Sequence, residues 1–325
     1  MNSNNKAPLI GLVAPMMWSM NVGMAKAVSE QFGRSVGYAI LYTIAFIGLM
    51  AVYGRPRFQD YSWKYIAFGI PCATMSAFCF VESLAISHDG FQAVQVGMVN
   101  YLWPSITIVL AIFFNGQKAR WWVALGFFLS IMGIVMVLGG DRGFDLKVFA
   151  ASVEDNPLCF LLGLCAALSW AAYNSFTRAW AGGKNPVVCI FLVNALVFIA
   201  MASWDGTGGV VSWTGWHGWV SLLLTALSTS AGYACWNYGM MKGNMTILAI
   251  VSYMIPVMSA LFTSLWVGAS LSWGFAKGVA LVVIGSFVCW LATLPKHPAR
   301  IRGSTFRGMR GTAIDIKGRA PSEED

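Results

Sequence analysis

Residues 98–116 read MVNYLWPSITIVLAIFFNG, an apolar stretch with a proline near its middle. Residues 250–268 read IVSYMIPVMSALFTSLWVG and follow the first stretch at an offset of 152 residues. At this offset Val99, Tyr101, Pro104 and Gly116 correspond to Val251, Tyr253, Pro256 and Gly268. An apolar helix with a central proline that occurs twice is typical of a duplicated transporter.

The composition indicates an integral membrane protein. The chain is 58% hydrophobic and only 10% charged, with a mean hydropathy of +0.65, whereas soluble domains carry about 25% charged residues. Apolar runs of about 20 residues are long enough to cross a hydrocarbon layer of about 30 Å. Because a backbone in lipid must satisfy its own hydrogen bonds, these runs are expected to be helices. We therefore predict an all-α integral membrane protein.

Ten transmembrane helices are predicted from the apolar runs. They cover residues 7–28, 36–54, 64–86, 91–114, 120–139, 157–180, 186–204, 217–240, 245–267 and 273–294.

The offset of 152 also relates other spans of the chain. Trp18 in the first span corresponds to Trp170 in the sixth, and Gly126 in the fifth corresponds to Gly278 in the tenth. Since each copy holds five spans, the second copy must enter the membrane upside down, as in secondary transporters. The predicted organisation is a first five-helix repeat over 1–140, an external linker over 141–156, a second, inverted five-helix repeat over 157–294, and a basic, flexible tail over 295–325.

The charges predict the orientation in the membrane. If both termini are cytoplasmic, most of the 21 lysine and arginine residues lie in cytoplasmic loops and in the tail. This distribution follows the positive-inside rule. It also accounts for the net charge of +8 better than a nucleic-acid partner does, so the expected surroundings are a lipid bilayer.

Motifs for catalysis, metal binding or ATP hydrolysis are missing from the sequence. The seven cysteines form no C-x-x-C pair, and none of the three histidines has a cysteine or carboxylate at ligand spacing. A phosphate-binding G-x-x-x-x-G-K-[ST] loop is also missing. We therefore expect neither an enzyme nor a bound cofactor or metal.

Three tryptophans, Trp18, Trp103 and Trp170, lie near the middle of predicted spans, away from the interfacial positions that tryptophan prefers. An indole N–H at that depth needs an acceptor or a wet cavity. Lining a substrate path is one interpretation, and packing in a helix core is the other.

Polar and aromatic residues recur at helical spacing on four spans, which suits a ligand with a flat apolar part. Hydrogen bonding between helices is the alternative interpretation. The residues are Asn100, Trp103 and Thr107; Trp170, Tyr173, Asn174 and Thr177; Thr229, Tyr233, Trp236 and Asn237; and Ser252 with Tyr253.

The two central prolines predict hinges. Pro104 cannot donate a hydrogen bond to the carbonyl of Asn100, and Pro256 cannot donate to that of Ser252. A freed carbonyl could bind an ammonium group or a water, and the kink gives a bending point. A static kink held by a neighbouring helix is the alternative.

Glu82 lies about one turn from the outer end of its span. An ionisable residue in lipid often has a function, so Glu82 is a candidate site for a substrate amine or a proton. Its closeness to the interface also permits a purely structural role.

The segments VNYLWPS (99–105) and FNGQK (114–118), supported by Trp18-Ser19 and Trp170-Ala171-Ala172-Tyr173, resemble the drug/metabolite transporter superfamily of the EamA type. The resemblance covers residues 7–294. It implies a basket of ten helices around a central cavity, in the bacterial inner membrane, that exports aromatic and other neutral amino acids. It further implies that Trp18, Asn100, Tyr101, Trp103 and Trp170 line the cavity, whereas Glu82 belongs to no matched motif.

The favoured hypothesis is a monomeric amino acid exporter that works by alternating access. One alternative is a broad drug or metabolite exporter of the same superfamily, and another is a membrane receptor or scaffold that transports nothing. The predicted substrate-binding residues are Trp18, Asn100, Tyr101, Trp103, Trp170, Tyr173, Asn174, Trp236 and Ser252, with Pro104 and Pro256 as hinges.

Overall fold

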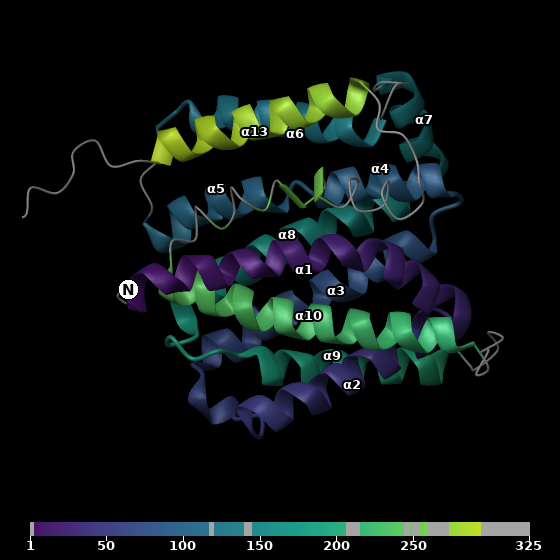
Figure 1. The fold of residues 1–325 in the computed structure, drawn as a ribbon, viewed down its shortest axis with the longest axis vertical. Coiled ribbons are helices and arrows are strands. Elements are labelled where there is room, and N and C mark those ends of the chain that lie inside the picture. Colours follow the sequence, from purple (N-terminus) through teal and green to yellow (C-terminus); the bar gives the residue numbers. More distant parts are fainter. Residues whose placement is uncertain are drawn as a thin grey trace, which may run out of the picture. The chain divides into compact units, whose positions relative to one another are not determined.

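The computed structural model describes residues 3–116, 120–139, 145–205, 215–243 and 273–293, together with isolated residues between 248 and 258. Throughout these residues the secondary structure is helical, without a strand, and Figure 1 shows the helices packed side by side. The prediction of an all-α fold is therefore confirmed. The predicted basic tail and most of the predicted span 245–267 lie outside the described residues.

The helices begin and end close to the predicted spans. They are α1 (Ser3–Phe32), α2 (Arg34–Tyr53), η1 (Phe58–Asp60), η2 (Tyr65–Gly69), α3 (Ile70–Ala85), α4 (Gly90–Asn100), α5 (Trp103–Asn115), α6 (Val123–Gly139), α7 (Leu146–Asp155), α8 (Pro157–Trp180), α9 (Val187–Trp204), α10 (Trp216–Lys242) and α13 (Trp273–Thr293).

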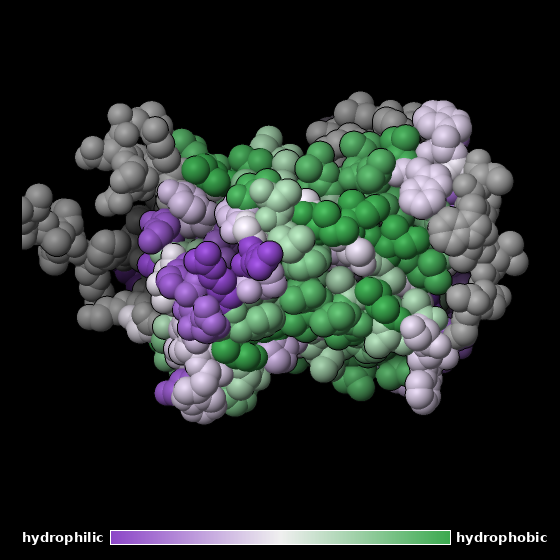
Figure 2. Space-filling model, turned by 90° about the horizontal axis from the view of Figure 1, so that it is seen from below, coloured by the Kyte–Doolittle hydropathy of each residue, from purple (hydrophilic) through white to green (hydrophobic). Residues whose placement is uncertain are grey.

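Four segments of the described chain are long and apolar enough to cross a membrane. They are Arg34–Tyr53, Tyr65–Ala85, Pro157–Trp180 and Val187–Trp204. Many large apolar side chains on the helices are exposed, among them Leu161, Leu196 and Phe287. Figure 2 shows a broad apolar surface, with hydrophilic residues gathered at its left edge. Such a surface is unsuited to water, but it is expected on helices that face lipid.

Two local features differ from the predicted spans. The span 91–114 is divided into α4 and α5 by a turn at Tyr101 and Leu102, and Pro104 lies in the first turn of α5. A proline fits the first turn of a helix, where its missing N–H costs no hydrogen bond. The predicted linker, residues 141–156, contains the helix α7 instead of a continuous loop.

Side-chain caps explain where several helices begin. Asp89 accepts a hydrogen bond from the Gln92 N–H at the start of α4, and Asp145 does the same for Lys147 at the start of α7. Asn156 accepts from the Cys159 N–H at the start of α8. Asp and Asn are favoured at this position because their side-chain oxygens satisfy a free backbone N–H.

Neighbouring helices form long pairs. α1 lies along α10, α3 along α8, α2 along α9, and α6 along α13 (Figure 1). The buried core contains many small residues, such as Ala166, Ala167 and Ala171, alongside large aromatic side chains. Small residues let helix backbones approach closely, which is the main source of packing energy between helices in lipid.

The pair α6–α13 has the clearest close approach. A Cβ atom added to Gly126 would lie 2.6 Å from the backbone N of Cys289, and one added to Gly133 would lie 2.5 Å from that of Val282. Real Cβ atoms do not come so near a backbone atom. Glycine is therefore required at both positions for this crossing.

We expect Gly133→Ala to lower the melting temperature of the purified protein in detergent, because the added methyl group must push α13 away. Overpacking of this kind costs about 1–3 kcal/mol. Gly48→Ala is the matched control, since a Cβ on Gly48 meets no atom within 4 Å and alanine is the better helix former. Equal melting temperatures for the two variants would contradict the close approach.

Candidate functional site

Aromatic side chains from four helices meet inside the bundle. We define the aromatic cluster as Trp18 (α1), Trp103 (α5), Trp170 and Tyr173 (α8), and Tyr233 and Trp236 (α10). The ring centroids of Trp18 and Trp170 are 5.5 Å apart, as are those of Trp18 and Trp236. Trp103 lies 6.0 Å from Trp170 and 5.6 Å from Trp236. The pair Trp18–Trp236 is tilted, the other three are edge-to-face, and all four distances are typical of favourable ring pairs.

The rings of the aromatic cluster contact one another, and all of them except Trp18 are buried. Trp103 is 5% exposed, Trp170 is 7% exposed and Trp236 is 1% exposed. Trp18 is half-buried, and its Nε1 is buried without a hydrogen-bond partner among the described residues. The three mid-span tryptophans therefore come together, as a shared substrate path requires, but in this conformation the rings pack against each other.

A hydrogen-bonded chain supports the cluster on one side. The Nε1 of Trp236 donates to the Oδ1 of Asn174 at 2.9 Å, and the Nδ2 of Asn174 donates to the Oγ1 of Thr107 at 3.4 Å. Asn174 and Trp236 were both predicted as site residues. Their bond holds one indole of the cluster in a fixed orientation and joins α8 to α10, and the bond to Thr107 adds α5.

A second polar chain starts at Tyr173. Its hydroxyl donates to the Oδ1 of Asn237, whose Nδ2 donates to the Oδ1 of Asn185 at 3.2 Å. Asn185 in turn donates to the carbonyl of Ala234 at 3.0 Å. These bonds tie the loop before α9 to α10, and they satisfy polar groups that would be costly to bury alone.

Further hydrogen bonds lie near Asn185, at the end of the bundle where α2 ends and α9 begins. The hydroxyl of Tyr61 donates to the Asn185 carbonyl at 2.9 Å, and burial raises the pKa of Tyr61. Arg178, in the last turn of α8, donates to the carbonyls of Met240 and Met241 at the end of α10. A cation at a helix C-terminus satisfies carbonyls that have no partner within the helix.

The remaining predicted site residues lie at different places. Asn100 ends α4, and Tyr101 follows in the turn that leads to Pro104 and α5. Ser252 is buried and donates to the carbonyl of Leu248 at 2.7 Å. Pro256, the second predicted hinge, lies outside the described residues.

Glu82 forms part of an ion triad with Arg34 and Asp205. The Nη1 of Arg34 lies 3.0 Å from the Oε2 of Glu82, and its Nη2 lies 3.8 Å from the Oδ2 of Asp205. The hydroxyl of Ser35 also donates to Asp205. The three charged side chains line a cavity of about 480 Å³ where α2 begins and where α3 and α9 end.

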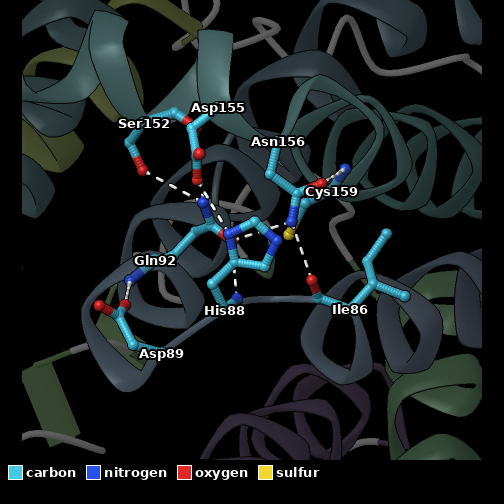
Figure 3. A network of polar contacts seen from close by, with 8 residues as sticks. All are labelled: Ile86, His88, Asp89, Gln92, Ser152, Asp155, Asn156 and Cys159. Carbon is cyan, nitrogen blue, oxygen red and sulfur yellow. Dashed lines mark hydrogen bonds and ion pairs between the residues drawn. The ribbon is translucent and has the colours of Figure 1, made fainter.

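A polar network at one end of α4 joins α7 and the start of α8 to the rest of the bundle (Figure 3). Asn156 donates to the Ile86 carbonyl at 2.8 Å and to the Oε1 of Gln92 at 2.9 Å. The Nδ1 of His88 lies 2.9 Å from a carboxylate oxygen of Asp155. The two residues are 67 positions apart, so no short spacing in the sequence could indicate this pair.

Sequence reasoning missed Arg34, Asn185 and Asp205. All three lie in or beside loops, where a polar residue is ordinary and carries no signal of its own. The single signal available was the charge of Glu82 within an apolar span, since such a carboxylate needs a cationic partner at the same depth.

We expect Asn174→Leu to lower the melting temperature, because it leaves the buried N–H of Trp236 without an acceptor, at a cost of about 1–3 kcal/mol. A double-mutant cycle with Trp236→Phe measures this coupling. The cost of Trp236→Phe should be smaller in the Asn174→Leu background than in the unmodified protein. Additive costs would show that the bond contributes nothing.

Comparisons with known proteins agree with this architecture. The profile of the EamA-like transporter family matches residues 5–139 and again residues 157–291. A solved crystal structure that is 22% identical has the same fold, with a TM-score of 0.71 over 89% of this chain and 98% of its own.

The curated relatives include proteins named "aromatic amino acid exporter YddG". Those from Salmonella typhimurium and Escherichia coli are each 36% identical, over 90% of this chain and 99% of the relative. The protein of that name from Ancylobacter novellus is 25% identical, over 89% of this chain and 98% of its own. The family profile thus covers most of this multi-pass membrane protein, and the chain belongs to the EamA-like transporter family.

Proposed function

We propose that the chain exports aromatic amino acids across the bacterial inner membrane, as a monomer with both termini in the cytoplasm. The observation that carries the proposal is the aromatic cluster, found in a chain that is 36% identical to exporters named for such substrates. An aromatic substrate ring can replace the ring-to-ring contacts that the cluster now makes with itself. Each such contact contributes about 0.5–1.5 kcal/mol beyond its buried area.

The polar groups of the cluster match the other end of an amino acid. The Nε1 of Trp18 is buried and has no partner among the described residues, so a substrate carboxylate could accept its hydrogen bond. We assign the substrate path to Trp18, Trp103, Trp170 and the groups that hold them. The latter are Asn100, Tyr101, Tyr173, Asn174, Trp236 and Ser252.

The fold of this transporter is proposed to be ten transmembrane helices arranged as two inverted five-helix repeats. The two profile matches support this, because they start 152 residues apart and have equal lengths. Contacts between helices obey the same offset. A Cβ on Gly11 would meet Leu248 at 2.6 Å, and a Cβ on Gly163 would meet Val96 at 2.9 Å. Gly163 follows Gly11 by 152 residues, and Leu248 follows Val96 by 152 residues, so the two contacts are equivalent.

Alternating access requires the aromatic rings to separate toward one side and then toward the other. The turn between α4 and α5 interrupts the helix just before Trp103 and Pro104. A backbone rotation in this turn would therefore move the Trp103 ring. We propose this turn as a hinge, with Pro256 as its counterpart in the second repeat. Hinges of this kind absorb backbone changes while the helices on either side stay rigid.

We expect Trp103→Ala and Trp170→Ala each to slow the exchange of radiolabelled L-phenylalanine into proteoliposomes about two- to tenfold, since each removes ring contacts to the substrate. Both variants should still insert and elute as folded protein. Trp121→Ala is the control, because Trp121 is 86% exposed and touches no part of the cluster. Unchanged exchange in both cluster variants would remove the assignment of the substrate path.

The orientation can be tested with single added cysteines. In intact cells, a membrane-impermeant maleimide should label Glu154→Cys, which lies in α7 between the repeats. It should label Lys184→Cys, between α8 and α9, only after the membrane is opened. The unsubstituted chain measures labelling of the seven native cysteines. Labelling of Lys184→Cys in intact cells would invert the proposed topology.

A further inference from the structure

The cavity beside the ion triad is separate from the aromatic cluster. Its charged wall consists of Arg34, Glu82 and Asp205, and its apolar wall includes Phe78, Val197 and Met201. Its volume of about 480 Å³ lies within the range of pockets that hold small molecules. An apolar wall beside a few convergent polar groups is the usual form of such a pocket.

The charges of this cavity do not balance. Two carboxylates face one guanidinium, which leaves one negative charge in excess. The Nη1 of Arg34 bonds to the Oε2 of Glu82, whereas its Nη2 lies further away, at 3.8 Å, from the Oδ2 of Asp205. The second carboxylate oxygen of Glu82, Oε1, is buried and has no hydrogen-bond partner among the described residues. A buried acceptor without a donor costs free energy, and a ligand that brings a charged donor would recover it.

The equivalent positions at the opposite end of the bundle carry no charge. At the offset of 152, the counterparts of Arg34, Glu82 and Asp205 are Pro186, Ala234 and Tyr53. There the helix junction is closed by a hydrogen bond from Asn185 to the carbonyl of Ala234 and by one balanced ion pair between Lys184 and Asp60. Packing of three helices at this position therefore requires no ion triad. The comparison of the two bundle ends rests on the proposed five-helix repeats, and the rest of the inference does not.

We propose that the cavity binds an organic ammonium ion attached to an apolar body. The ammonium group lies beside the carboxylates of Glu82 and Asp205 and neutralises the excess charge, while Phe78, Val197 and Met201 cover the apolar part. Two sources supply this chemistry, namely the α-amino group of an aromatic amino acid and the ethanolamine headgroup of a phospholipid. Either would bind at the end of the bundle where α2 begins, away from the aromatic cluster.

Binding is tested with radiolabelled phenethylamine, an aromatic amine without a carboxylate, on the purified full-length protein in phosphatidylcholine nanodiscs. The choline headgroup carries no N–H and cannot donate to Glu82. We expect Glu82→Gln, which keeps the shape and the bond to Arg34, to weaken binding at least tenfold. Arg34→Gln should tighten binding, because it removes the competing cation. A purely structural triad predicts no such opposite effects.

Two further variants guard against misfolding and general charge effects. Ala200→Trp leaves the ion triad intact and fills the cavity from an exposed position on its wall, so it should also abolish binding. Glu154→Gln removes one exposed carboxylate outside the cavity and should bind as the unmodified protein does. Equal affinity in the unmodified protein, Glu82→Gln and Ala200→Trp would overturn the proposal.

Competition distinguishes the two sources. Displacement of the probe by L-phenylalanine would assign the cavity to a free amino acid. Weaker probe binding when phosphatidylethanolamine replaces part of the phosphatidylcholine would assign it to a lipid headgroup. Because the readout involves no transport, failure of this proposal leaves the export proposal standing, and failure of the exchange assay leaves this one standing.

Discussion

Helices surrounded by lipid gain little from burying apolar side chains, so close packing and internal hydrogen bonds must hold the bundle together. The crossing of α6 and α13 shows this constraint most directly. Gly126 and Gly133 bring one backbone against the backbone of Cys289 and Val282. Dispersion energy falls steeply with distance, so a gap of even 1 Å between two such helices forfeits much of the attraction.

The same constraint shapes the centre of the protein. A substrate path through a membrane needs polar groups, but each of these groups must have a partner whenever no substrate is present. Asn174 meets this need by pairing with Trp236 and Thr107, and Tyr173 by pairing with Asn237. The Nε1 of Trp18 is buried and has no partner among the described residues, so within the proposed path it is a donor left free for a ligand.

Much of this arrangement could be predicted from the sequence because the signals are local or periodic. Apolar runs predicted the helices, and the spacing of Trp170, Tyr173 and Asn174 predicted that they share one face of α8. The meeting of Trp18 with Trp170 and Trp236 depends on helix packing, and sequence periodicity says nothing of which helices are neighbours. Partners such as Arg34 for Glu82 lie 48 residues apart, and no short pattern connects them. The helix α7 was missed because its residues follow a polar segment that reads as a loop.

Under the proposed alternating access, the two ends of the bundle exchange roles, and contacts at one end must break as those at the other form. A symmetric sequence would make the two open states equal in energy. This sequence is asymmetric, since one end holds the Arg34 triad, with two carboxylates for one guanidinium, while the other combines the neutral bonds of Asn185 with a single ion pair between Lys184 and Asp60. Opening the first end exposes an ion pair whose Glu82 side chain is mostly buried, whereas opening the second separates amide bonds and a more exposed ion pair. The two openings therefore recover different amounts of solvation. The free-energy difference between the two open states is therefore set by polar residues at the bundle ends, and the aromatic cluster between them can be optimised for the substrate alone.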